Sequence, residues 1–192
     1  MPADYPHRQF DDAAAFDAFL AEHGASEPGV RLRIAKKGSE HTTITHSDAI
    51  DVALCHGWID GIRNALDADF FLQTFTPRRP RSLWSKVNRL RVEALIEAGR
   101  MRPAGHAEID LAKNDGRWEA AYDSQRTIEV QPDLAAALDA NPEAKAFFVT
   151  LSSKNRYAIL FRLHNLKRAE TRARRIEEFV AMLARHETVH PQ

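Results

Sequence analysis

The spacing of hydrophobic and polar positions predicts short helices and strands in the first part of the chain. Residues 11–23 carry apolar side chains at helical intervals, which is typical of a helix with one buried face. Residues 30–34 alternate apolar side chains with arginines, the pattern of a strand that buries one face against a core. Residues 45–56 fit a second helix, because a threonine and an aspartate three residues later form a capping pair at its start. This order predicts an α+β fold.

The next stretch predicts a turn and a β-hairpin. The segment 57–61 has a glycine at each end, and glycine reaches backbone angles that are closed to other residues, so we expect a turn there. Residues 62–66 and 70–76 then form two strands, the second of which ends at Pro77, because proline has no N–H to donate to a sheet. With the strand before them they form a small antiparallel sheet, and we expect Trp58 to be buried beside it.

After the hairpin the periodicity predicts helices only. The first of them covers 85–98, and everything beyond about residue 128 has a helical pattern. The predicted organisation is therefore an α+β domain over 1–128, in which helices pack on the small antiparallel sheet, followed by an all-helical module over 129–192. Four residues of the helix over 85–98 are expected to face inward: Val87, Leu90, Ala94 and Leu95.

Charge is balanced over the whole chain but not along it. Lysines and arginines number 27, as do aspartates and glutamates. This balance argues against a protein whose whole surface is basic and binds nucleic acid or another polyanion. Residues 76–102 nevertheless carry eight bases against two acids. Any preference for anions must therefore come from a patch. A small anionic ligand or a protein partner is a better expectation than nucleic acid.

The densest basic segment is the best candidate for a binding site. Guanidinium groups bind carboxylates and phosphates through paired hydrogen bonds, and prolines at 77 and 80 stiffen the loop that carries them. The alternative is a solvated charged surface with a packed tryptophan. Both interpretations stay open. The candidate ligand-binding residues are Arg78, Arg79, Arg81, Trp84 and Lys86, bordered by Trp58, Asp60 and Arg63.

Other polar residues give weaker indications. Asp60, near Arg63, either caps a turn or acts as a general acid or base. Cys55 and His56 lie at the expected C-terminal end of a helix, the wrong end for activating a thiol, so we expect Cys55 to be packed in the core. The histidines at 41, 46 and 56 lack the spacing of metal ligands, and the chain has no phosphate-loop or hydrolase motif. We therefore expect no metal and no cofactor.

Three segments resemble one protein family. Residues 55–61 and 75–88 read CHGWIDG and FTPRRPRSLWSKVN, and a long helical stretch covers 141–183. Together they are similar to the YdeI/OmpD-associated, or bacteriocin-protection, family, over nearly the whole chain from Phe10 to Arg185. The resemblance implies a role in protection against bacteriocins and a link to outer-membrane physiology. It implies no particular reaction.

The lone cysteine and the first residues predict the compartment. Cys55 has no partner for an intramolecular disulfide, which favours a reducing compartment. The start, MPADYPHRQFDD, has neither the basic nor the apolar region of a secretory signal, and no apolar run is long enough to span a bilayer. We therefore expect a cytoplasmic protein without membrane insertion.

Two functions stay open. The first is a stress- or resistance-associated protein that binds an anionic ligand or partner without turnover. The second is a small enzyme whose site is built from Asp60, Arg63 and the loop from Arg78 to Lys86. Because the sequence contains no motif for a reaction, binding is the preferred hypothesis. The sequence predicts no oligomeric state.

Overall fold

A computed structural model describes residues 5–191 of the chain and confirms the α+β class with a helical C-terminal region. The described residues divide into two compact units. The N-terminal unit holds the described residues up to Trp84 and Asn88–Ala120. The C-terminal unit holds Ser85–Val87 and the described residues from Ala121 on.

The N-terminal unit contains a sheet in which the strand order is β1-β2-β4-β3. β1 runs parallel to β2, and the other neighbouring strands are antiparallel. The short strand β1 was not predicted, because two residues carry too little periodicity to detect. The elements are β1 (His7–Arg8), α1 (Ala13–His23), β2 (Val30–Ala35), α2 (His46–Cys55), β3 (Trp58–Ala65), β4 (Phe70–Pro77), α3 (Lys86–Glu97, whose first two residues belong to the other unit) and α4 (Pro103–Asn114).

The strand β2 has the alternating burial that its sequence predicts. Val30, Leu32 and Ile34 are at most 1% exposed, whereas Arg31 and Arg33 are only partly buried. The side chains of a strand alternate between the two faces of its sheet, so the apolar residues face one side and the arginines the other. The predicted orientation of this strand is confirmed.

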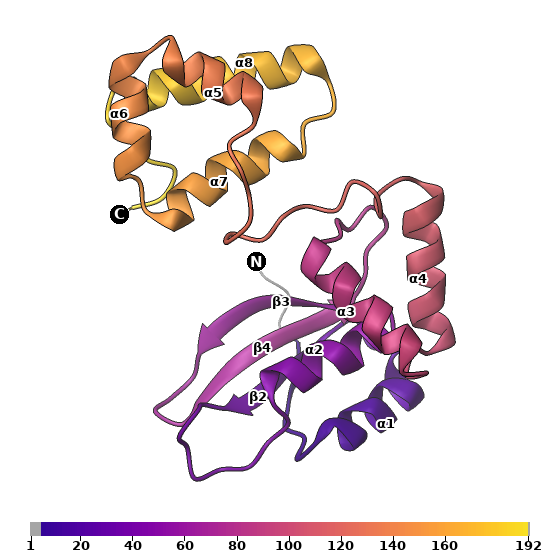
Figure 1. The fold of residues 1–192 in the computed structure, drawn as a ribbon. Coiled ribbons are helices and arrows are strands. Elements are labelled where there is room, and N and C mark those ends of the chain that lie inside the picture. Colours follow the sequence, from indigo (N-terminus) through magenta and orange to yellow (C-terminus); the bar gives the residue numbers. More distant parts are fainter. Residues whose placement is uncertain (1–4, 192) are drawn as a thin grey trace. The chain divides into compact units, whose positions relative to one another are not determined.

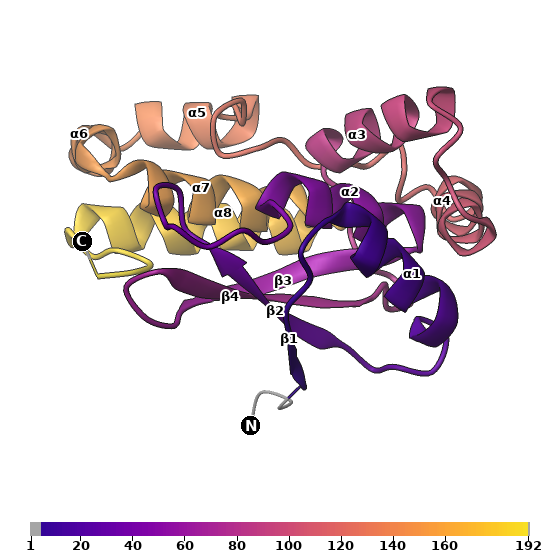
Figure 2. The same cartoon turned by 90° about the horizontal axis from the view of Figure 1, so that it is seen from below.

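Helices α1 and α2 lie against the apolar face of the sheet (Figure 1, Figure 2). Each begins at a side-chain cap, because the Asp12 carboxylate accepts the Ala15 N–H at 2.8 Å and the Thr45 hydroxyl accepts the Asp48 N–H at 3.1 Å. Their inward residues complete the core of the unit. This core contains Phe16, Phe19, Leu20, Val30, Leu32, Ile34, Ile44, Ala49, Val52, Ala53, Trp58, Phe71 and Phe75.

The segment 57–61 is not the turn that its two glycines suggested. Only Gly57 has a left-handed backbone, with φ of 74°, and it ends α2 so sharply that β3 begins at the next residue. A Cβ on Gly61 would meet Thr74 at an ordinary 3.6 Å, so this position does not require glycine. A β-bulge instead interrupts the pairing between Asp60 and Arg63.

Helix α3 buries a different face from the one predicted. Val92 and Leu95 are buried, whereas Val87 and Leu90 are 45% and 67% exposed. Ala94 is exposed as well. The helix carries apolar side chains on two faces, and only the packing of the folded unit selects between them. Of the four residues expected to face inward, Leu95 alone does so.

The C-terminal unit is built from helices around a core of its own (Figure 1). Asn141 and Ser152 cap two of these helices by accepting backbone N–H groups three residues ahead. None of the helices among residues 5–191 is both long and apolar enough to cross a membrane. The elements of this unit are α5 (Pro132–Asp139), α6 (Pro142–Thr150), α7 (Ser153–His164) and α8 (Ala169–Ala184).

Candidate functional site

Two residues of the predicted arginine loop are part of the hydrophobic interior. Arg78 is 5% exposed, and its guanidinium carbon lies over the Trp84 ring, 3.6 Å from the centroid. Trp84 is 2% exposed and packs edge-on against Trp118, with ring centroids 5.0 Å apart. The Arg78 Nη1 group donates a hydrogen bond to the Leu83 carbonyl at 3.3 Å. The Trp84 ring is thus covered, and it offers no open face on which a ligand could stack.

The remaining bases of the loop are exposed. The backbone N–H of Arg79 donates to the Ser82 hydroxyl at 3.0 Å, and Arg81 holds a left-handed backbone with φ of 71°. Lys86 belongs to the C-terminal unit, where its ammonium group forms an ion pair with Asp123 at 2.8 Å. The loop therefore presents Arg79 and Arg81 to solvent, while Lys86 is held by an acid.

The three bordering residues lie in or beside the sheet. Trp58 is 2% exposed and sits in the core, as predicted. Asp60 is partly buried, and Arg63 lies over the Phe71 ring at 3.6 Å. In the sheet Arg63 pairs with Gln73. Arg78 follows Gln73 by five residues, so at ~3.3 Å per residue of extended chain it lies about 16 Å from the Arg63–Gln73 pair. An anion-binding groove that joins all these residues stays a prediction.

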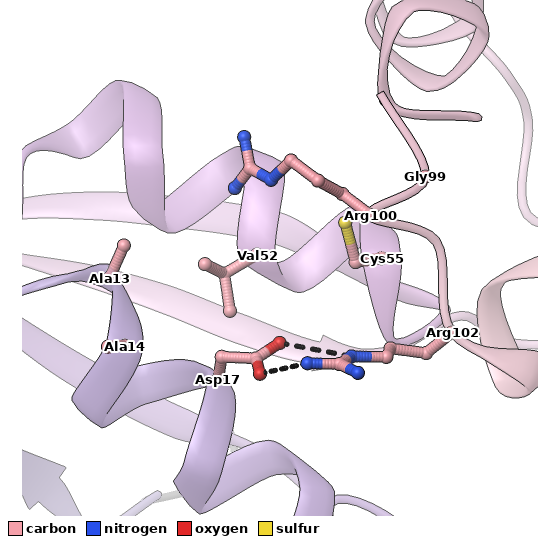
Figure 3. Close-up of a pocket in the computed structure, with 8 residues that line it drawn as sticks. All are labelled: Ala13, Ala14, Asp17, Val52, Cys55, Gly99, Arg100 and Arg102. Carbon is pink, nitrogen blue, oxygen red and sulfur yellow. Dashed lines mark hydrogen bonds and ion pairs between the residues drawn. The ribbon is translucent and has the colours of Figure 1, made fainter. Parts of the chain in front are cut away.

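A cavity of about 330 Å³ opens between α1, α2 and the chain that joins α3 to α4 (Figure 3). Alanines and a valine form its apolar wall, and two arginines, an aspartate and a cysteine supply its polar groups. The residues that line it are Ala13, Ala14, Asp17, Val52, Cys55, Gly99, Arg100 and Arg102.

Asp17 is the most heavily bonded group of this cavity. Its carboxylate accepts from Arg102, with Nη2 at 2.5 Å from Oδ2 and Nε at 3.4 Å from Oδ1. The ring nitrogen Nε2 of His56 lies 2.8 Å from Oδ1. Burial raises the pKa of this carboxyl, but hydrogen bonds from Arg102 and His56 and the charge of Arg102 outweigh it, so the pKa of Asp17 lies below its ordinary value. Asp17 therefore stays ionised and fixes Arg102.

The backbone positions Arg102 as firmly as its side-chain contacts do. The Arg102 N–H donates to the Cys55 carbonyl at 3.1 Å, which ties the start of α4 to the end of α2. Gly105 allows this approach, because a Cβ at that position would collide with the same carbonyl oxygen and with the Met101 side chain. Close packing of the two helix ends thus places Arg102 at the rim of the cavity.

Arg100 differs from Arg102 in having no acid to hold it. In Figure 3 its side chain extends past Cys55 and Val52 on the side opposite Arg102. Among the residues that the structure describes, none forms a hydrogen bond or ion pair with its guanidinium group. Since Asp17 neutralises Arg102, the cavity carries about one uncompensated positive charge beside an apolar wall.

The Cys55 thiol faces the cavity but is poorly suited to act as a nucleophile. The residue is 2% exposed, which confirms the predicted packing. Burial raises the pKa of the thiol, with Arg100 opposing this in part, so the group stays protonated at neutral pH. Cys55 contributes a small, weakly polar surface to the cavity.

Two separate parts of the chain match the models of two different protein families. Residues 8–108 match the model of a family described as a domain of unknown function, DUF8412. The chain belongs to this DUF8412 family. Residues 127–186 match the family described as bacteriocin-protection, YdeI or OmpD-associated, which confirms the resemblance seen in the sequence. Searches of curated proteins and of solved structures found no match.

All eight cavity residues lie within the part that the DUF8412 model covers. The motifs at 55–61 and 75–88 lie there too. Of the three segments on which the resemblance to the bacteriocin-protection family rests, the match to that family therefore covers only the helical stretch 141–183. Over residues 5–191, no group of three or more histidines, cysteines or acids is arranged to hold a metal ion.

Sequence reasoning missed Asp17, Arg100 and Arg102. The one signal for Asp17 was its position as a lone acid between Phe16 and the buried positions Phe19 and Leu20. The two arginines belong to the basic stretch 76–102, but nothing in their spacing distinguishes them from its other bases. Their meeting with α1 is a tertiary contact, and no local pattern encodes it.

Proposed function

We propose that the N-terminal unit of this DUF8412 protein binds a small carboxylic acid, without turnover, in the cavity beside Arg100. The observation that carries the proposal is the pair of guanidinium groups: Arg102 is held by Asp17, and Arg100 has no acidic partner among the described residues. A guanidinium fork matches the two oxygens of a carboxylate, which favours a bidentate contact with Arg100. One uncompensated charge suits a ligand with a single negative charge.

The size and walls of the cavity narrow the ligand class. Small-molecule pockets generally measure about 300–1,000 Å³, so a cavity of about 330 Å³ suits a ligand of a few carbon atoms. The methyl groups of Ala13, Ala14 and Val52 offer an apolar surface opposite the charged rim. A short-chain acid such as propionate or butyrate fits both surfaces, because its carboxylate can contact Arg100 and its alkyl chain can pack on the methyl groups.

The state of the polar groups favours binding over catalysis. A raised pKa keeps the Cys55 thiol neutral, and the Asp17 carboxylate is already committed to Arg102 and His56. Neither group is poised to give or take a proton near neutral pH. For the enzyme alternative at Asp60, Arg63 and the 78–86 loop, no comparable cluster supports a reaction.

We extend the proposal to a stress- or resistance-associated role in the cytoplasm. The match of residues 127–186 to a bacteriocin-protection family supports the connection to resistance. A single cysteine, held as a free thiol, fits a reducing compartment. In this proposal the acid bound by the N-terminal unit is the signal or cargo of that role.

The test is a titration of the intact protein with acetate, propionate and butyrate, with chloride at equal ionic strength as the reference. Binding should raise the melting temperature, because a ligand at 100 times its Kd stabilises the folded state by about 2.7 kcal/mol. The Arg100→Gln variant should lose this response. The matched control is Arg79→Gln, which removes one exposed guanidinium elsewhere and should respond like the wild type.

A second variant changes the volume of the cavity without changing its charge, so a lost response cannot be attributed to the loss of a positive charge alone. Ala14 is an exposed helical residue that lines the cavity, so Ala14→Leu should fill the space without unfolding α1 and should weaken binding of butyrate more than that of acetate. If Arg79→Gln abolishes the response and Arg100→Gln does not, the site lies in the arginine loop and the proposal is wrong.

A further inference from the structure

The N-terminal unit has a second cavity at the opposite end of α2. It measures about 480 Å³ and lies where β2 ends, the following loop turns and α2 begins. The Arg100 cavity lies near the last turn of the same helix, which is ten residues and so about 15 Å long. The two cavities are separate sites.

Three cationic side chains line the second cavity: Lys36, Lys37 and Arg63. None of the described residues that line it carries a carboxylate. Lys36 is held in place, since its ammonium group donates to the Asp67 carbonyl at 2.6 Å. In the part of the chain that the structure describes, no acid forms an ion pair with Lys37 or Arg63. The excess of positive charge is therefore larger than in the Arg100 cavity.

Arg63 is held in an orientation that leaves its donors free. Its guanidinium carbon lies over the Phe71 ring, 3.6 Å from the centroid, after the bulge that follows Asp60. Stacking uses the face of a guanidinium and leaves the N–H groups along its edge available to an anion. This pre-organisation lowers the entropy that Arg63 would lose on binding.

The start of α2 adds to the field in the cavity. His46, in its first turn, lies 3.1 Å from the Gln73 side-chain oxygen through Nε2, and the first N–H groups of a helix carry partial positive charge. The negative charge of Asp48 opposes this positive field in part. Its carboxylate lies at the start of the helix, where it accepts a hydrogen bond from the Thr45 hydroxyl at 2.7 Å. Asp67 also interacts electrostatically with Lys36. Neither acid lines the cavity or forms an ion pair with Lys37 or Arg63, so two cationic side chains stay uncompensated among the described residues.

We propose that this second cavity binds a small phosphorylated molecule with at least two negative charges. A phosphate monoester carries about 1.5–2 negative charges at neutral pH and three acceptor oxygens, which match the fixed guanidinium edge and the two lysines. A carboxylic acid with one charge would leave part of this positive charge uncompensated. The inference concerns a different site and a different ligand class from the proposed function, and it stands or falls independently of it.

The experiment measures binding of pyrophosphate to the full-length protein by calorimetry at low ionic strength. Arg63→Gln should weaken binding at least tenfold, and Lys37→Gln, which changes an exposed residue, should weaken it without altering the fold. The matched control is Arg33→Gln. Arg33 lies over the neighbouring Phe70 ring at the same 3.6 Å but points to the other face of the sheet, so its loss should leave the affinity unchanged.

Three outcomes would overturn the inference. Equal affinity in wild type, Arg63→Gln and Lys37→Gln would show that pyrophosphate binds elsewhere. Citrate binding as tightly as pyrophosphate would contradict the assignment to phosphate. A single-stranded oligonucleotide that binds through Arg63 while pyrophosphate does not would replace a small phosphate with nucleic acid as the ligand.

Discussion

Asp17 joins three elements through one carboxylate, because it lies on α1 and bonds both His56 at the end of α2 and Arg102 before α4. The two partners differ in exposure: the His56 side chain is 7% exposed and that of Arg102 is 51%. The bond to His56 satisfies a buried nitrogen, whereas the bond to Arg102 sets the charge at the rim of the cavity.

The lowered pKa of Asp17 predicts how stability depends on pH. Because the pKa is lower in the folded than in the unfolded state, ionised Asp17 stabilises the fold above about pH 4, the ordinary value of a carboxyl, and this contribution is lost as the pH falls through the folded pKa. The free energy of unfolding of wild type should therefore exceed that of Asp17→Asn at neutral pH, and the difference should shrink in acid. Urea denaturation between pH 7 and pH 3 measures both.

Asp110→Asn is the matched control for that series, since Asp110 is an exposed acid on α4 with no bonded partner among the described residues. Its unfolding free energy should run parallel to that of the wild type across the whole range. A difference between wild type and Asp17→Asn that stays constant down to pH 3 would show that ionisation of Asp17 does not stabilise the fold.

Trp58 tests the core of the N-terminal unit. It is 2% exposed and belongs to the cluster that α1, α2 and the sheet share. We expect Trp58→Ala to lower the free energy of unfolding by about 3–5 kcal/mol, because it leaves a large cavity in a packed interior. Chemical denaturation gives this value directly, and a change below about 1 kcal/mol would mean that the indole is not a core residue.

Single residues could be predicted where the backbone pattern alone fixes their environment. The burial of Val30, Leu32 and Ile34 follows from alternation along one strand. The stacking of Arg78 on Trp84 could not be predicted, because five residues of irregular chain separate the two and the contact depends on how the loop folds back. Charge in a sequence predicts solvent exposure only on average.

At the scale of elements, α2 and α4 approach each other closely where Gly105 faces the Cys55 carbonyl. Gly105 makes it possible, so Gly105→Ala should push α4 away from the Cys55 carbonyl and cost about 1–3 kcal/mol, although alanine is otherwise the better helix former. Binding of propionate should weaken too, since Arg102 moves with α4. Thermal unfolding and the carboxylate titration measure the two effects.

Gly61→Ala is the control for this prediction. A Cβ there would meet Thr74 at 3.6 Å, an ordinary contact, so the substitution should change stability by less than about 0.5 kcal/mol. If both variants behave alike, the close approach at Gly105 does not determine the position of α4.

The elements themselves were predictable in type but not in every boundary or face. Caps and periodicity located α1, α2 and β2, because these signals are local. The segment 57–61 misled because glycine permits a turn without requiring one, and the pairing of β3 with β4 drew it into the sheet. The buried face of α3 was likewise decided by its neighbours.

For the whole molecule, the two compact units correspond closely to two family matches, over residues 8–108 and 127–186. The proposed binding residues come from three separated segments, 13–17, 52–55 and 99–102, all in the first of these. A site assembled by tertiary contacts has no continuous motif, which is why sequence reasoning selected the dense arginine loop instead.

The most direct test of the central claim locates the bound acid by NMR. In isotope-labelled full-length protein, titration with propionate should shift the backbone signals of Ala13, Ala14, Val52 and Cys55 and the side-chain Nε–Hε signal of Arg100, all with one saturating dependence on concentration. Saturating shifts confined to the loop residues Arg79 and Arg81, or no saturation at the cavity residues, would contradict the account.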